Sequence, residues 1–166
     1  MSAITQIQHE DKIVCFTLAH EMFGVPISMV HEIIRPAAIT AMPRSPDYVK
    51  GVLNLRGKII PVVDLRKRFG LEEAEETKET RIVVVGVGGL TVGMVVDGVS
   101  EVLRIRAEDI EPPSPIIATV DSEYIRGVGK VEGRLIILLD TEMILSHQDK
   151  EHLSLAANDS VKDLIE

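Results

Sequence analysis

The sequence predicts an all-β fold of two small barrels, with short helices beside the strands and a short C-terminal helix. Three observations support this prediction. Short apolar runs rich in Val and Ile alternate with turn signals at regular spacing. Hydrophobic residues make up 45% of the chain, yet it has no Trp, three Phe and two Tyr, so the core must be aliphatic. The chain also contains an internal repeat, which indicates a duplicated β unit.

The repeat is visible in two ungapped alignments. Residues 48–65 align with residues 124–141, and residues 13–35 align with residues 82–104. Each alignment contains six identical pairs, where about one or two are expected by chance from average residue usage. The second copy carries seven extra residues between Arg104 and Tyr124. We therefore treat residues 1–166 as a single domain, with repeat units at about 13–65 and 82–141 that form two barrel subdomains.

The first unit follows a polar segment, residues 1–11, that is expected to be loose. Its elements are predicted as a strand at 12–18, a turn at 19–22, a strand at 23–27, a helix at 29–34, a strand at 39–42 and a loop at 43–46. Ser28 is a suitable N-cap for the helix. The helix must end before Pro36, because the residue preceding a proline is driven out of the α region.

A tight hairpin follows in the first unit. Two apolar runs, 52–55 and 59–63, flank Arg56-Gly57-Lys58, where the glycine supplies the positive φ that the turn needs. Arg56 is therefore expected at the tip, presented to solvent on a rigid support. Pro61 cannot donate a ladder hydrogen bond, which favours an edge strand or a bulge. A short helical turn at 65–69 is predicted to stop at Gly70.

The second unit repeats this order after an acidic surface connector at residues 72–80. The predicted elements are strands at 81–87 and 91–96, a strand at about 101–106, an extended proline-rich loop at 111–115, and the repeated hairpin at 124–139. Asp140 or Thr141 is a suitable cap for a helix that continues to about residue 146. Residues from about 148 to 166 are expected to form a loose tail.

Bulk composition limits the possible functions. No apolar run is long enough to span a membrane, and the N-terminus lacks a basic-then-apolar signal sequence. Cys15 is the only cysteine, so a reducing cytoplasm is the expected setting. The net charge of −8 argues against nucleic acid or anionic lipid as the main ligand.

The sequence offers no credible nucleophile, general base or metal cluster. His9, His20 and His31 are evenly spaced, but the first lies in the polar segment and the second in a turn, so we interpret them as surface residues. Cys15 alternates with core positions and is interpreted as a small buried hydrophobe.

Three aspartates that end apolar runs resemble catalytic carboxylates at first sight: Asp64, Asp97 and Asp140. Asp64 and Asp140 are equivalent in the repeat, and both precede short helical segments. Helix N-capping is therefore the favoured interpretation for these two side chains.

The two repeats differ at their hairpin tips. Glu132 stands in the second unit where the first has Arg56, and Lys130 stands where the first has Asn54. A changed tip on a retained scaffold suggests a binding site, although an ordinary solvated arginine would look the same. Val30 and Val99 occupy equivalent positions and either line a seam between the barrels or belong to the core.

The run NLRGKIIPVVDLRKRFG at residues 54–70 resembles the signature of the CheW family of bacterial chemotaxis coupling proteins. Residues 23–24, 30–34, 93–102 and 124–127 resemble other parts of that family in order and spacing, so the resemblance covers about residues 12–147. CheW-like domains also occur in the histidine kinase CheA and in CheV. This chain is too short for either and has no kinase or phosphoacceptor segment, so a free-standing coupling protein fits best.

The resemblance implies two five-stranded SH3-like barrels without enzymatic activity, cofactor or metal. It implies a cytoplasmic adaptor that is recruited to membrane-bound receptor arrays. This adaptor would join the cytoplasmic tip of a chemoreceptor hairpin to the regulatory domain of CheA. Whether it also contacts other coupling proteins in the arrays stays open. Carried over by position, the receptor-binding residues would be Val30, Ile33, Gly51, Arg56, Gly57, Val99 and Val102. The kinase-binding residues would be Ile27, Glu32, Glu111, Pro112 and Ile116.

Two alternatives stay open at this point. The first is a CheW-like paralogue that serves a two-component pathway other than chemotaxis. The second is a small ligand-binding β-barrel, which would need a cavity with converging polar groups, whereas the inward positions are almost wholly aliphatic. A nucleic-acid-binding barrel would need exposed aromatic residues and a basic face, and the sequence shows neither.

Overall fold

The computed structural model describes residues 10–87, 89–112, 121–146, 148–151 and 153. Eleven strands dominate these residues, and the predicted all-β class is confirmed. Within these ranges no helix has the length and apolar character needed to cross a membrane.

The strands and short helices follow one another in a regular order. The strands are β1 (Glu10–Leu18), β2 (Glu21–Pro26), β3 (Val30–Ile34), β4 (Val49–Leu55), β5 (Lys58–Asp64), β6 (Arg81–Val87), β7 (Leu90–Val96), β8 (Gly98–Arg106), β9 (Ile110–Glu111), β10 (Ile125–Val131) and β11 (Arg134–Leu139). The short helices are η2 (Ile27–Met29), α1 (Leu65–Arg68), η3 (Ala107–Asp109), η4 (Ser122–Tyr124) and η5 (Thr141–Met143).

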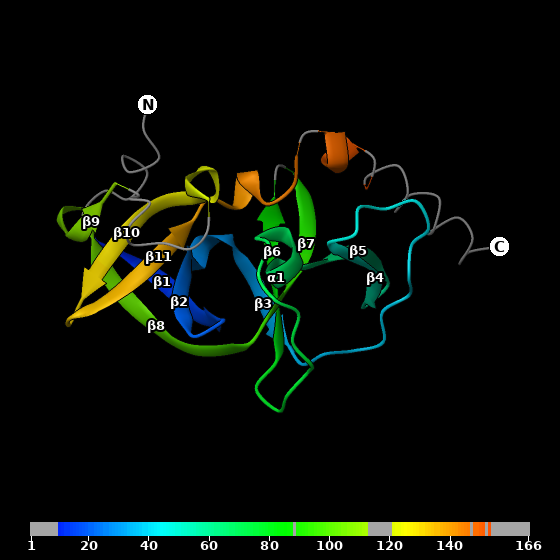
Figure 1. Ribbon diagram of the computed structural model, residues 1–166, viewed down its shortest axis with the longest axis horizontal. Helices are drawn as coiled ribbons and strands as arrows, with labels where there is room; N and C mark the ends of the chain where they lie inside the picture. The colour runs from blue at the N-terminus through cyan, green and yellow to red at the C-terminus, as the bar shows by residue number, and fades with distance from the viewer. Residues whose placement is uncertain (1–9, 88, 113–120, 147, 152, 154–166) are drawn as a thin grey trace.

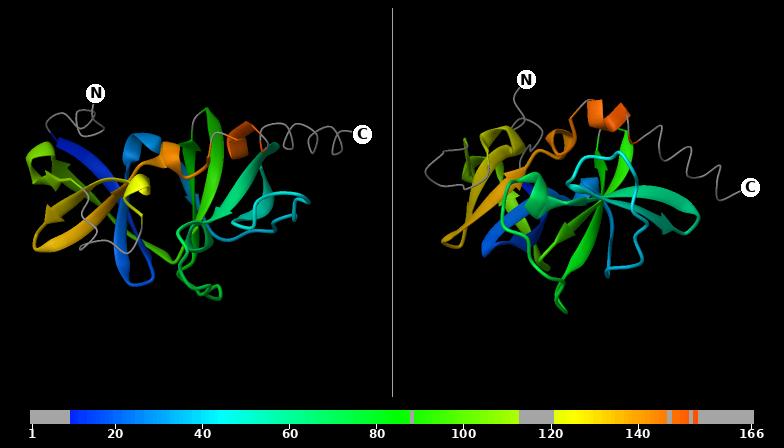
Figure 2. Two further views of the ribbon diagram at one scale, coloured as in Figure 1. Left: turned by 45° about the horizontal axis from the view of Figure 1, so that its top comes forward. Right: turned by 45° about the vertical axis from the view of Figure 1, so that its right-hand side comes forward.

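The strands form two mixed sheets, which lie side by side as two lobes (Figures 1 and 2). Sheet A has the order β8-β1-β2-β11-β10-β9, and sheet B has the order β3-β6-β7-β5-β4. Each sheet therefore combines the first hairpin of one repeat unit with the later strands of the other unit. The two repeat units therefore do not fold as separate sheets, because they exchange their first hairpins.

The exchange preserves the repeat in detail. Parallel pairing joins β11 to β2 in sheet A through Leu138 and Gly24, and it joins β5 to β7 in sheet B through Val62 and Gly93, which are the equivalent residues. The register also shifts at equivalent places, in β4 against β5 and in β10 against β11. The two lobes thus share one topology although each is assembled from both halves of the chain.

Three apolar clusters stabilise this arrangement. The largest contains inward residues of both sheets, including Phe16 and Phe23 from sheet A and Met94 from sheet B. A second cluster around Cys15 lies within sheet A, and a third around Ile60 lies within sheet B. Because the largest cluster receives side chains from both lobes, burial of apolar surface is the main force that holds the lobes together.

The two hairpin turns have the positive φ angles that their glycines predicted. The two residues between β4 and β5, Arg56 and Gly57, both have positive φ, at 52° and 85°. Glu132 and Gly133 between β10 and β11 have φ values of 51° and 78°. Two positive-φ residues in a two-residue loop match the twist of the flanking strands, which is why such loops favour glycine.

Several predicted elements differ in the structure. Residues 30–34 form strand β3 instead of a helix, because they pair with β6 in sheet B. Only Thr40 of the predicted strand 39–42 has a ladder partner, Val52. Pro61 lies in an internal strand, but its pairing is with β4 alone, because the parallel pairing of β5 with β7 starts at Val62.

Part of the segment that was predicted to be a loose tail is helical and packs against the core. Residues 148–151 and 153 are helical, and Leu153 is fully buried in the largest cluster. The hydroxyl of Tyr48 also donates a hydrogen bond to the Asp149 carboxylate. This segment was expected to be loose because it is polar, and a single buried leucine was too weak a signal to reveal its docking.

Helix α1 lies at the centre of the molecule, between the lobes (Figure 1). Asp64 caps it by accepting hydrogen bonds from the backbone N–H groups of Arg66 and Lys67, and Asp140 caps η5 in the same way through Glu142. The N-capping interpretation of both aspartates is therefore confirmed. The guanidinium of Arg68 lies over the ring of Tyr48, at 4.6 Å, and over the ring of its repeat equivalent Tyr124, at 4.9 Å.

Candidate partner-binding surfaces

The β4–β5 hairpin presents Arg56 at its tip, as the sequence predicted. The side-chain oxygen of Asn54 accepts a hydrogen bond from the backbone N–H of Gly57 at 2.9 Å, which stabilises the turn. The Arg56 side chain is 74% exposed, and its guanidinium forms an ion pair with Glu32 on β3. Arg56 and Glu32 were expected to serve different partners, but the structure brings them into direct contact.

The two glycines in the predicted receptor site have different roles in the structure. Gly57 has positive φ and open space around its Cα, so it serves the turn alone. Gly51 is buried, has a φ of 147°, and packs its Cα against the backbone of Thr40. A Cβ there would lie 2.7 Å from the Thr40 carbonyl carbon. Gly51 therefore permits close approach of two backbones below the hairpin and is not itself a surface contact.

The aliphatic residues of the predicted receptor site lie on two equivalent edge strands, β3 and β8. Val30 and Val99 are half-buried and pack against the largest apolar cluster, so the core interpretation accounts for part of their surface. Ile33 and Val102, which are also equivalent in the repeat, expose 41% and 51% of their surface. Exposed aliphatic side chains on edge strands are typical of protein-binding surfaces.

The predicted kinase-binding residues are more dispersed. Ile27 in η2 is 41% exposed. Glu111 and Pro112 are exposed at the end of β9, and Glu111 forms an ion pair with Lys130 at 3.0 Å. Ile116 lies outside the described residues.

A comparison with known protein families identifies the domain that carries these surfaces. The CheW-like domain model matches residues 12–149. The chain belongs to the CheW-like family. It is 40% identical over 134 residues to "Chemotaxis protein CheW" of Klebsiella aerogenes, covering 81% of both chains, and 36% identical over 140 residues to the protein of that name from Rhizobium meliloti, covering 84% and 90%.

A solved CheW structure has the same fold. The scaffolding protein TtCheW from Thermoanaerobacter tengcongensis is 40% identical and superposes with a TM-score of 0.77, over 84% of this chain and 90% of that chain. Membership of the CheW-like family makes this chain a non-enzymatic scaffolding adaptor of chemotaxis.

One feature of this CheW-like chain escaped the sequence analysis. Arg134, directly after the β10–β11 turn, forms an ion pair with Glu101 on β8 at 2.6 Å. Glu101 is the repeat equivalent of Glu32, so each lobe has an edge-strand glutamate paired with an arginine from the neighbouring hairpin. The identity of Glu32 and Glu101 was the available signal, but Arg134 aligns with Lys58 and not with Arg56, which concealed the pairing.

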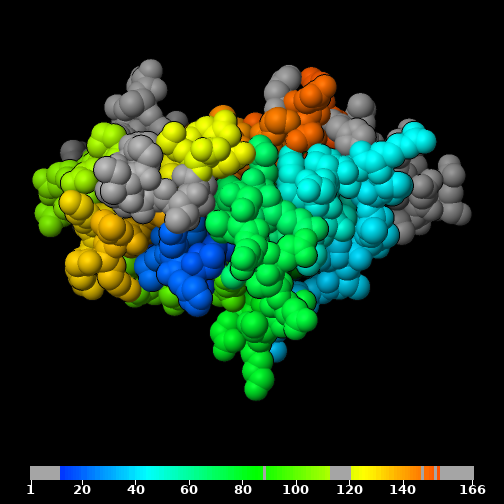
Figure 3. All heavy atoms as spheres, viewed as in Figure 1, coloured from blue at the N-terminus to red at the C-terminus, as the bar shows by residue number. Residues whose placement is uncertain are grey.

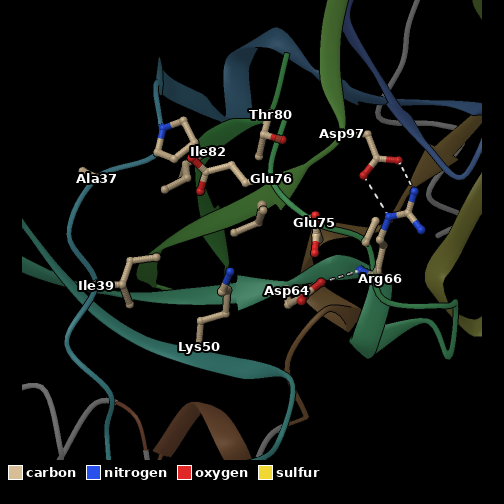
Figure 4. A pocket seen from close by; sticks show the side chains of 13 residues that line it. Ala37, Ile39, Lys50, Asp64, Arg66, Glu75, Glu76, Thr80, Ile82 and Asp97 are labelled. Carbon is tan, nitrogen blue, oxygen red and sulfur yellow. Dashed lines mark hydrogen bonds and ion pairs between the residues drawn. The ribbon is translucent and has the colours of Figure 1, made fainter. Parts of the chain in front are cut away.

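A second missed feature is a small polar hollow of about 70 Å³ on the sheet B lobe, bordered by β5, α1 and the acidic connector (Figure 4). At its edge the Asp97 carboxylate accepts two hydrogen bonds from the Arg66 guanidinium, at 2.9 and 2.5 Å. These bonds, together with one from the backbone N–H of Ala19, hold the pKa of Asp97 below its usual range. From the sequence alone, Asp97 was only a residue that ends an apolar run.

The Cys15 thiol of the CheW-like chain is buried. Burial raises the pKa of the Cys15 thiol to about 11, so the thiol stays protonated and unreactive at neutral pH. No group of three or more His, Cys, Asp or Glu residues within the described ranges is arranged to hold a metal ion. Residues 72–79 of the acidic connector are exposed and project from the body (Figure 3), whereas Thr80 at its end is buried.

Proposed function

We propose that this chain couples the cytoplasmic tip of methyl-accepting chemoreceptors to the regulatory domain of the histidine kinase CheA, so that receptor state controls kinase activity. It acts in the cytoplasm and is recruited to membrane-bound receptor arrays, where contact with other coupling proteins is also expected. The observation that carries the proposal is the exposed Arg56 tip beside the edge strand that contains Ile33, both within the CheW-like match.

The receptor site consists of the Arg56 tip and the aliphatic residues of β3 and β8. A receptor tip is a helical hairpin, so it offers carboxylates, helix-terminal carbonyls and apolar side chains. The Arg56 guanidinium is suited to the first two, and its stem covers apolar surface. Val30, Ile33, Val99 and Val102 supply the apolar contacts, while Gly51 and Gly57 hold the hairpin in the required shape.

The kinase site consists of Ile27 and Glu32 on one side, and of Glu111, Pro112 and Ile116 on the other. Ile27 is an exposed aliphatic residue next to β3, which suits it to bury apolar surface against a protein partner. Because Glu32 is paired with Arg56, the two proposed sites adjoin at this ion pair.

Calorimetry with a soluble receptor-tip fragment and with the isolated CheA regulatory domain tests the proposal. The wild-type chain is expected to bind both. Arg56→Ala removes a charge-assisted contact worth about 1.5–3 kcal/mol, so receptor affinity is expected to fall roughly ten- to a hundredfold. Kinase affinity should persist, and the free energy of unfolding should stay within about 0.5 kcal/mol of the wild type because the side chain is exposed.

Arg134→Ala is the matched control, since Arg134 is the arginine beside the equivalent hairpin of the other lobe and also pairs with an edge-strand glutamate. It is expected to leave receptor binding unchanged. Normal receptor binding by Arg56→Ala, or equal losses in the two variants, would show that Arg56 is not in the receptor site. Failure of the wild-type chain to bind either fragment would reject the coupling function.

A further inference from the structure

The chain passes between the two sheets at two places, and these places are equivalent in the repeat. The first passage runs from β2 to β3 through η2, where Ser28 is exposed. The second runs from β7 to β8 through a single residue, Asp97, which aligns with Ser28. The passages therefore differ in that only the second carries a charged side chain at this position.

Asp97 connects its own passage to one segment from each lobe, the β1–β2 hairpin and helix α1. Its backbone N–H donates a hydrogen bond to the carbonyl of Thr17 at 3.0 Å, and its carboxylate accepts one from the backbone N–H of Ala19 at 2.9 Å; both partners belong to the β1–β2 hairpin of sheet A. The same carboxylate accepts both hydrogen bonds from Arg66 in α1, the helix that directly follows β5 of sheet B. Figure 4 shows this bidentate pair at the edge of the polar hollow.

Arg66 is held in turn by its surroundings. Its Nη1 donates a hydrogen bond to the carbonyl of Glu72 at 2.8 Å, at the start of the acidic connector. Its side chain is only 18% exposed. A bidentate arginine–carboxylate pair has a defined orientation, so it restricts the rotation of one lobe against the other more than a single hydrogen bond would.

The passage at Asp97 leads directly into the proposed receptor site. Val99 lies two residues after Asp97 and, in the β1–β8 ladder, stands opposite Phe16 of the largest apolar cluster. Asp97 and Val99 also line the same hollow, of about 240 Å³, on this side of the molecule. Any change in the angle between the lobes at Asp97 therefore moves β8, with Val99 and Val102, relative to the Arg56 tip on sheet B.

We propose that the Asp97–Arg66 pair is a latch that fixes the relative orientation of the two lobes, and that receptor binding depends on this orientation. Asp97 and Arg66 are thus positioning residues, and neither needs to touch the receptor. The predicted effect of the latch on receptor binding depends on the proposed function. Its effect on lobe orientation stands without that function.

The first measurement tests lobe orientation directly. Spin labels are attached at Lys58→Cys in sheet B and Glu132→Cys in sheet A, two exposed hairpin positions, and the distance between them is measured by double electron–electron resonance. Native Cys15 is buried and stays unlabelled. Adding Asp97→Asn, which keeps the shape but removes the charge, is expected to broaden or shift the distance distribution. Lys67→Gln, which removes an exposed ion pair to Glu73 from the same helix, is the matched control and should leave the distribution unchanged.

The second measurement tests the functional consequence. Asp97→Asn and Arg66→Gln are each expected to lower affinity for the receptor-tip fragment by about threefold to thirtyfold, the range typical of coupling through residues outside a binding site. Affinity for the CheA regulatory domain should change less than twofold. A core variant whose side chain does not line the hollow beside the latch, Ile60→Val in the sheet B cluster, controls for lost stability and should leave receptor affinity unchanged.

The outcomes separate the latch from the coupling function. An unchanged label distance in Asp97→Asn overturns the latch. The latch is also overturned if Ile60→Val, destabilised to the same unfolding midpoint as Asp97→Asn, loses as much receptor affinity. If the wild-type chain fails to bind the receptor fragment, the proposed function is rejected, while the label distances still decide whether the pair orients the lobes.

Discussion

Sheet A and sheet B share one strand order and the same positions of register shift, yet they differ where they meet solvent. Sheet B ends its β4–β5 hairpin in a cationic tip at Arg56, whereas the equivalent tip of sheet A is Glu132. The edge strands keep an equivalent pair of exposed aliphatic residues, Ile33 and Val102. The aliphatic residues and the glutamate of the edge strands are thus retained in both copies, whereas the charge at the hairpin tip differs.

The largest expected difference between the lobes concerns the glycines below the two hairpins. Gly51→Ala would force a Cβ against the Thr40 backbone at a φ that side chains rarely adopt, so it is expected to cost about 3 kcal/mol or more. The equivalent Gly127 lacks a positive φ, and its Cβ would lie 2.6 Å from Cγ2 of Ile110 and 3.1 Å from the carbonyl oxygen of Glu111, so its nearest obstacle is a side chain and not the backbone. Gly127→Ala should therefore cost about 1–2 kcal/mol in urea unfolding. Equal costs would mean that both backbones tolerate the methyl group alike.

A second prediction compares the two passages between the sheets. The pKa of Asp97 is lowered in the folded chain by the hydrogen bonds from Arg66 and Ala19, and the nearby His20 lowers it further when charged. A lowered pKa means that the ionised form stabilises the fold above the unfolded-state pKa near 3.8. This stabilisation is lost as the pH falls through the lower folded-state value.

Asp97→Asn is accordingly expected to cost about 1–2 kcal/mol at pH 7, and the difference from the wild type should shrink as the pH falls below 4. Ser28→Ala in the equivalent passage should show no such pH dependence. Urea unfolding at pH 7 and pH 3.5 measures both variants. A penalty for Asp97→Asn that stays constant with pH would contradict the assigned role of its charge.

The smallest expected effect is on the second arginine–glutamate pair. Arg134 and Glu101 are 38% and 43% exposed, and exposed ion pairs contribute little net stability. Arg134→Ala should therefore leave the urea midpoint unchanged within error and should lose its small effect entirely at high salt. A clear loss of stability would indicate that the hairpin of sheet A depends on this pair in a way that the hairpin of sheet B does not depend on Arg56.

Much of the local structure could be predicted from the sequence, because it depends on residues close together in the chain. The turn at Arg56-Gly57 follows from the glycine, and the caps at Asp64 and Asp140 follow from their place before short helices. The helix predicted at residues 29–34 failed because its pairing partner, β6, lies about 50 residues away and its capping signal at Ser28 was only local. Pairing with the distant strand β6 therefore determined the conformation of residues 30–34 more strongly than their local helix signal did.

The exchange of hairpins could not be predicted for a different reason. Equivalent strands of the two repeats have the same apolar pattern, so pairing within a unit and pairing between units bury the same kinds of side chain. The exposed position of Arg56 could be predicted from its turn, whereas the choice of Ile33 and Val102 as receptor contacts came from the resemblance and stays a prediction. The contact of Arg56 with Glu32 and the role of Asp97 depend on which strands become neighbours in space.

The exchanged hairpins also give the chain an order of assembly during synthesis. All strands of sheet B have been synthesised once the chain reaches residue 96. Strand β2 of sheet A, by contrast, gains its parallel partner β11 only when the chain reaches residue 139. Until β8 is made, only sheet B can cover the β1–β2 hairpin with Phe16 and Phe23; β8 then pairs with β1, while β2 still lacks its second neighbour. The nascent chain therefore carries β2 as an open edge until its last described strand, β11, emerges, and contacts so distant in sequence slow the final folding step.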